Sequence, residues 1–178
     1  IVGSAQGEKD SFGQPIAENY IDKMVTIKNT GKSDAWVRAY FAIPSALDDG
    51  FDTFNAGMNI LHFNFGNQDG KTTYNEQWLW GFDGVAYNVY YADYFEPLAA
   101  DSTTEQFVSG VYLDKDVDRN EEGQYVIQRN GTETVIEGFD GLANCPVFAV
   151  AVQADGFASA ADAVTAAFGE DFNPWAAE

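Results

Sequence analysis

The 178-residue chain is long enough to form one domain with its own core, and its aromatic content of 15% favours a packed β protein. Twenty-eight acidic residues against nine basic ones give a formal net charge of -19, which repels phosphate backbones and anionic membrane surfaces. Nucleic acid is therefore disfavoured as a partner. The sequence shows no signal peptide and no apolar run long enough to span a bilayer, so we expect a cytosolic protein or a mature one whose leader has been removed. The start at Ile1-Val2, without Met, favours processing.

The first 19 residues, IVGSAQGEKDSFGQPIAEN, are rich in glycine and polar side chains. Their apolar side chains are scattered, at positions such as Ile1, Val2 and Phe12. Such a segment cannot bury enough surface to order itself. We therefore expect a tail, or a strand that needs a partner, followed by a single domain over residues 20–178.

Residues 25–43, VTIKNTGKSDAWVRAYFAI, predict two strands joined by a turn. Period-two alternation places the odd-numbered residues from 35 to 43 on one face of the second strand. Asn29 and Gly31 tolerate the positive φ of a turn, and Pro44 lacks the N–H that a central strand needs. The stretch therefore predicts a strand pair of the kind found in β-sandwiches.

Further strands are predicted from the same alternation at residues 60–65, 85–91 and 107–113. Residues 45–59 read as a loop or short helical turn. Asn130-Gly131 is the strongest hairpin signal, because both residues accept positive φ, and it should join strands at 124–129 and 132–137. Residues 147–153, VFAVAVQ, are apolar on both faces, which predicts a central strand covered on both sides.

The period changes near the end of the chain, where ASAADAVTAAF predicts a short helix. Ser159 can cap it, Asp162 follows three residues later as in a capping box, and Gly169 can stop it. About eight strands with one late helix favour an all-β fold over an α/β fold. The expected architecture is a jelly-roll-like β-sandwich with one short C-terminal helix and minor loop helices.

Oxygen-bearing side chains alternate along DKDVDRNEEG, as at the opening of a calcium loop: Asp114, Asp116, Asp118 and Asn120. An EF-hand would need glycine at its sixth position and glutamate at its twelfth, where this chain has Arg119 and Tyr125. The segment is therefore either a candidate calcium site outside that motif or a solvated acidic loop. No other cofactor is expected.

No pattern predicts catalysis. The only histidine, His62, cannot form an H-E-x-x-H zinc motif, and no serine stands in a G-x-S-x-G elbow. Cys145 is the only cysteine, so no intrachain disulfide can form, and we expect a buried, inert thiol.

Two features of the sequence, an N-x-T tripeptide and a group of aromatic residues, each allow a binding or modification role and a purely structural one. Asn130-Gly131-Thr132 matches the N-glycosylation acceptor pattern, although its turn role explains it equally. A group of aromatic residues could stack on sugars or pack in the core: Trp78, Trp80, Tyr87, Tyr90, Tyr91 and Tyr94.

Three segments resemble the TasA/camelysin family, whose members are exported with a SipW-type signal peptide. They are VTIKNTG at residues 25–31, DAWVR at 34–38 and AVAVQADGF at 149–157, the last followed by the alanine-rich helix. The similarity runs from about residue 20 to residue 169. Some relatives carry a metalloprotease label, but the absence of a recognisable zinc motif here argues against transferring that activity.

The resemblance implies a jelly-roll subunit of a secreted cell-surface or biofilm-matrix fibre, in which the N-terminal segment of one subunit completes the sheet of the next. Carried onto this sequence, the donor strand lies within residues 1–12, with Ile1, Val2 and Phe12 as candidate anchors. The expected partner is a second copy of the chain, forming a homopolymer. The alternative from the residues is a monomeric cell-surface adhesion domain that binds glycans through its aromatic side chains.

Overall fold

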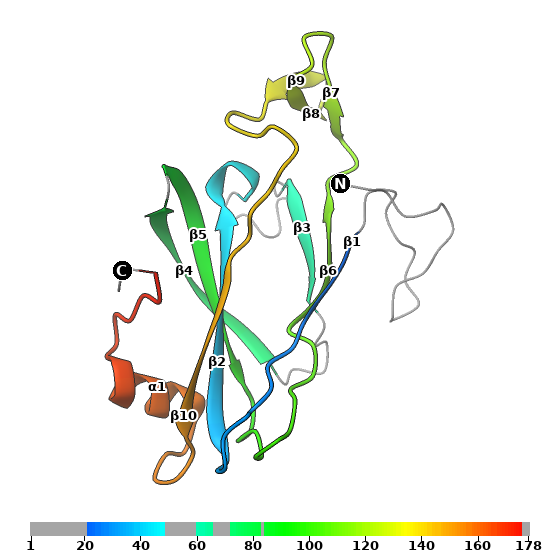
Figure 1. Ribbon diagram of the computed structural model, residues 1–178. Helices are drawn as coiled ribbons and strands as arrows, with labels where there is room; N and C mark the ends of the chain where they lie inside the picture. The colour runs from blue at the N-terminus through cyan, green and yellow to red at the C-terminus, as the bar shows by residue number, and fades with distance from the viewer. Residues whose placement is uncertain (1–20, 49–59, 66–71, 83, 176–178) are drawn as a thin grey trace.

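A computed structural model describes residues 21–48, 60–65, 72–82 and 84–175. These residues form ten strands in three antiparallel sheets, one α-helix and one short 3-10 turn (Figure 1). The all-β class expected from the sequence is confirmed. No helix in the described ranges is long and apolar enough to cross a membrane. The candidate anchors Ile1, Val2 and Phe12 lie outside the described residues.

The largest sheet has four strands in the order β10-β2-β5-β4. Their bounds are Val147–Gln153 for β10, Ala35–Pro44 for β2, Val85–Tyr94 for β5 and Thr72–Phe82 for β4. All ten residues of β2 are buried, because both faces of this strand are covered. Val37 and Phe41 pack in one core, as the alternation predicted, whereas Tyr40 packs in a second core on the opposite face.

A three-stranded sheet covers the face of β2 that carries Val37 and Phe41. Its order is β1-β6-β3, with β1 at Ile21–Val25, β6 at Val108–Leu113 and β3 at Leu61–Phe65. Val25 and Val111 from this sheet pack against the shared core. The face of the four-stranded sheet that looks toward β1, β6 and β3 is called its inner face below.

The expectation that the strands on either side of residues 29–31 pair with each other is wrong. β1 pairs with β6 and β2 pairs with β5 and β10, so the two strands belong to different sheets. The turn between them exists, but its cause is not positive φ. The side chain of Asn29 accepts a hydrogen bond from the Gly31 N–H at 2.9 Å and donates one to the Leu98 carbonyl at 2.9 Å.

The helix α1, Ala160–Phe168, covers the outer face of the four-stranded sheet. Its caps are confirmed: Ser159 accepts a hydrogen bond from the Asp162 N–H at 3.1 Å, and Gly169 ends the helix with a φ of 93°. A single 3-10 turn, η1 at Ser45–Leu47, follows β2 where a loop or short helical turn was expected.

A small third sheet forms one end of the molecule (Figure 1). It contains β7 at Val117–Arg119, β8 at Tyr125–Arg129 and β9 at Thr132–Val135. The predicted hairpin is confirmed, since Arg129 pairs with Thr132 across Asn130 and Gly131, whose φ values are 52° and 77°. Strand β7 was not predicted, because its residues were assigned to the acidic loop.

Candidate functional site

Strand β10 is an edge strand, which corrects the prediction of a central strand covered on both sides. Its outer face is partly covered: Val150 is buried, and Phe148, although 41% exposed, meets Trp175 edge-on with ring centroids 6.3 Å apart. Its inner face is not. Val147, which is 38% exposed, Ala149 and Ala151 lie on this face and are all exposed. We call these three residues the β10 inner face.

The contrast with the neighbouring strand shows where cover is missing. Val147, Ala149 and Ala151 lie opposite Phe41, Ala39 and Val37 of β2, and directly opposed residues of an antiparallel pair share a face. Those three residues of β2 are no more than 3% exposed. The three-stranded sheet therefore covers β2 but stops short of β10.

Strand β1 lies at the side of the three-stranded sheet that is nearest to β10. In the described part of the chain it has a strand partner on one side only, β6. Val25 from the end of β1 and Val147 from the start of β10 line the same shallow apolar hollow, together with Val108 and Cys145. A strand added to the open edge of β1 would therefore lie over the β10 inner face, because adjacent strands are only about 4.8 Å apart.

The two open strands differ in their protection against pairing, because β1, IDKMV, contains Asp22 and Lys23 and pairs with β6 in an irregular register, whereas β10 has no such feature. Natural edge strands are commonly blocked by charged side chains, proline or bulges. The sequence of β10, VFAVAVQ, contains no charge and no proline. The uncovered position beside β1 and over β10 is the candidate functional site of the described structure, and the chemistry it offers is backbone pairing with burial of apolar side chains.

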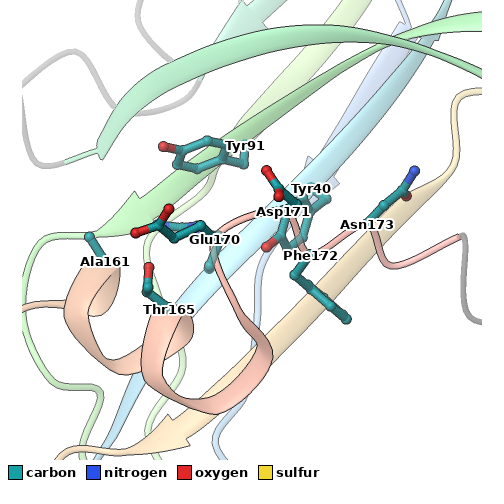
Figure 2. Close-up of a pocket in the computed structure, with 9 residues that line it drawn as sticks. Tyr40, Tyr91, Ala161, Thr165, Glu170, Asp171, Phe172 and Asn173 are labelled. Carbon is teal, nitrogen blue, oxygen red and sulfur yellow. The ribbon is translucent and has the colours of Figure 1, made fainter.

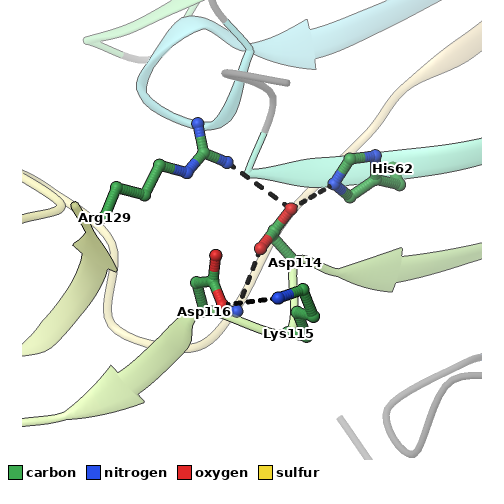
Figure 3. Close-up of polar contacts among 5 residues, drawn as sticks. All are labelled: His62, Asp114, Lys115, Asp116 and Arg129. Carbon is green, nitrogen blue, oxygen red and sulfur yellow. Dashed lines mark hydrogen bonds and ion pairs between the residues drawn. The ribbon is translucent and has the colours of Figure 1, made fainter. Parts of the chain in front are cut away.

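Asp114, predicted as a calcium ligand, instead joins separate elements of the fold (Figure 3). Its Oδ2 lies 2.8 Å from Nε2 of His62 on β3 and 3.4 Å from a guanidinium nitrogen of Arg129 on β8. Its Oδ1 accepts a hydrogen bond from the Asp116 N–H at 2.9 Å. Burial alone would raise the pKa of Asp114, but this backbone hydrogen bond, His62 and Arg129 together lower it.

The other three predicted calcium ligands serve local contacts. Asp116 Oδ1 accepts from the Lys115 ammonium at 3.1 Å, and Asp118 stands on β7, which pairs with β8. Asn120 Oδ1 accepts from the N–H groups of Glu122 and Gln124 and so holds the turn after β7. Within the described ranges, no three histidine, cysteine or acidic side chains are grouped to hold a metal ion. Calcium binding stays a prediction that this placement does not support.

The remaining candidate residues, for glycosylation, sugar stacking and thiol chemistry, differ in how exposed they are. Asn130 is exposed at the tip of the β8–β9 hairpin, and its glycosylation stays a prediction. Of the aromatic residues weighed for sugar stacking, Tyr87, Tyr90 and Tyr94 are at most 9% exposed in the cores, and Tyr91 is half-buried. The side chains of Trp78 and Trp80 lie outside the described part. Cys145 is half-buried rather than fully buried.

Comparison of the chain with protein-family models, with curated proteins and with solved structures gave no match. A functional proposal therefore rests on the chain's own motifs and on the geometry of the open position beside β1.

Proposed function

We propose that this protein is a structural subunit of an extracellular filament and that it polymerises head-to-tail by donating its N-terminal segment to the next subunit. The observation that carries the proposal is the β10 inner face, an apolar surface left uncovered beside the open edge of β1. A donated strand would pair with β1 through main-chain hydrogen bonds and bury Val147, Ala149 and Ala151. It would extend the three-stranded sheet and complete a jelly-roll-like sandwich.

The positions of the family-like motifs support the same site. The segment at residues 25–31 begins at the last residue of β1, and the segment at 149–157 contains most of β10. Both flank the position that a donated strand would occupy. A shared need to accept a neighbour's strand would explain why these two segments, which are far apart in sequence, carry the resemblance.

The donor in this proposal is residues 1–12, with Ile1, Val2 and Phe12 as the anchoring apolar side chains. Because donor and acceptor are different surfaces, the contact does not close on itself, and each addition exposes a new acceptor. The subunit needs no enzyme activity or cofactor for this role. Secretion to the cell surface or a biofilm matrix follows from the family resemblance.

Electron microscopy of N-terminal variants tests the proposal. Deleting residues 1–12, or replacing Ile1, Val2 and Phe12 by serine, should leave a folded monomer that forms no filaments. Replacing Glu8, Lys9 and Asp10 by serine is the matched control, since it changes three residues of the same segment without removing an apolar anchor. Filaments of normal appearance from the deletion variant would overturn the proposal, as would a wild-type protein that stays monomeric at every concentration.

A further inference from the structure

A second surface lies on the opposite, outer face of the four-stranded sheet. A pocket of about 630 Å³ opens between this face and the end of α1 with the segment that follows it (Figure 2). The sheet contributes Arg38, Tyr40 and Tyr91 to its wall, and the helical side contributes Thr165 and residues 170–173. Figure 2 shows Tyr91 on one side of the space and Thr165 and Glu170 on the other.

The one basic residue of the lining is already neutralised. Arg38 donates to both carboxylate oxygens of Asp93, its partner across β2 and β5, at 2.6 and 2.9 Å. Its guanidinium also lies 4.0 Å from the centre of the Tyr91 ring. Arg38 is only 8% exposed, so its charge is engaged within the wall and is poorly placed to attract an anionic ligand.

Two carboxylates of the lining have no such compensation. Glu170 and Asp171 are exposed, and no ion-pair partner for either exists among the residues that the structure describes. Since the charges of Arg38 and Asp93 cancel, the pocket has an excess of negative charge beside the half-buried rings of Tyr91 and Phe172, while Tyr40 is only 1% exposed and lies beneath them. This combination differs from a plain acidic surface, because the carboxylates border a hollow with an aromatic wall.

We propose that this pocket binds an organic cation whose head is an alkylammonium or guanidinium group. The carboxylates of Glu170 and Asp171 would pair with the head. An alkyl stem would lie along the half-buried rings of Tyr91 and Phe172. A free polyamine and a lysine or arginine side chain of a peptide present the same chemistry. This site is separate from the filament contact and does not depend on it.

Isothermal titration calorimetry can test the site and distinguish the two sources of the cation. The probes are spermidine, and the end-blocked tripeptides Gly-Lys-Gly and Gly-Arg-Gly. Tighter binding of spermidine indicates a free polyamine, and tighter binding of a tripeptide indicates a peptide side chain; either result supports the proposal. To keep polymerisation out of the readout, the titrations are repeated with the protein lacking residues 1–12, provided that its melting curve shows it to be folded.

The decisive comparison is between two variants that remove the same number of charges. Glu170→Gln with Asp171→Asn should weaken the affinity about five-fold or more, from the loss of two ion pairs. Glu121→Gln with Glu122→Gln, in the exposed turn after β7, should change it less than about two-fold, because only long-range attraction is lost. All four residues are exposed, so both variants should fold. Equal weakening by the two variants, binding of neutral maltotetraose in place of the cations, or no binding at all would overturn the proposal.

Discussion

Placing a charge on the β10 inner face should block polymerisation without unfolding the subunit. Ala149 is the central residue of this face and is exposed in the subunit, so an aspartate there can remain hydrated. In a filament the donated strand would cover it. An aspartate side chain is too short to reach solvent past that strand, so Ala149→Asp places an unpaired charge in an apolar contact.

The size of the effect follows from the difference between the two states. Leaving a buried charge unpaired costs roughly 3–5 kcal/mol, which corresponds to a rise of about two to four orders of magnitude in the critical concentration for assembly. In the subunit, the lower β propensity of aspartate costs at most about 1 kcal/mol, or roughly 2–4 °C in melting temperature for a chain of this size. The substitution therefore separates assembly from folding.

Sedimentation of polymer across a concentration series measures the first quantity, and thermal unfolding followed by circular dichroism measures the second. The matched control is Thr134→Asp, which places the same charge on an exposed residue of another edge strand, β9. The control should assemble like wild type. The reasoning is refuted if Ala149→Asp assembles at the wild-type critical concentration, or if Thr134→Asp blocks assembly equally.

Three further predictions concern the stability of the subunit. Asp114→Asn should lower the free energy of unfolding by about 1–2 kcal/mol at pH 7. Because the folded-state pKa of Asp114 is lowered, this contribution is present above the ordinary Asp value of about 3.9 and is lost as the pH falls through the folded-state pKa. Urea unfolding of the wild type and of Asp114→Asn from pH 7 to pH 2 checks this. A difference in unfolding free energy between them that does not change with pH contradicts it. Removing one partner of the buried Arg38–Asp93 pair, as in Arg38→Met, should lower the free energy of unfolding by about 3 kcal/mol, because it leaves the Asp93 charge unpaired. The double variant Arg38→Met with Asp93→Leu should recover part of that loss. Denaturant unfolding of the four-protein cycle measures the coupling, and a double variant no more stable than Arg38→Met would count against it. Excess calcium should leave the melting temperature unchanged, since the four predicted ligands do not converge; a rise of several degrees would instead establish binding to the folded state.

The sequence predicted those elements whose cause is local. The hairpin at Asn130 and Gly131 and the caps of α1 at Ser159 and Gly169 each depend on the conformation or hydrogen bonds of a few neighbouring residues. The residues of β2 that share a face were also predicted correctly, because side-chain direction alternates along an extended backbone.

Features that depend on distant partners could not be predicted. An apolar strand has the same pattern whether its neighbours cover it or leave it open, so VFAVAVQ predicted a central strand where β10 lies at an edge. The exposure of Val147, Ala149 and Ala151 results from the missing cover and leaves no mark in the local pattern. The acidic residue Asp48 lies in a loop-like stretch, yet it is buried and accepts hydrogen bonds from Asn88 and Tyr90, about 40 residues away.

The chain's only cysteine allows the filament contact to be tested directly. Cys145 lines the hollow between β1 and β10, where the donated strand would lie. Single cysteines introduced at each of positions 1–12 should form disulfides with Cys145 of the neighbouring subunit under mild oxidation, when their side chains face the hollow.

Gel electrophoresis without reductant reads the result. Strand donation predicts a ladder of covalent multimers for at least one donor position. The positions next to it in sequence should give no ladder, because side chains alternate along a strand. Replacing Cys145 by serine should abolish the ladder in every case. Monomers and dimers alone at all twelve positions would contradict head-to-tail strand donation into the open position beside β1.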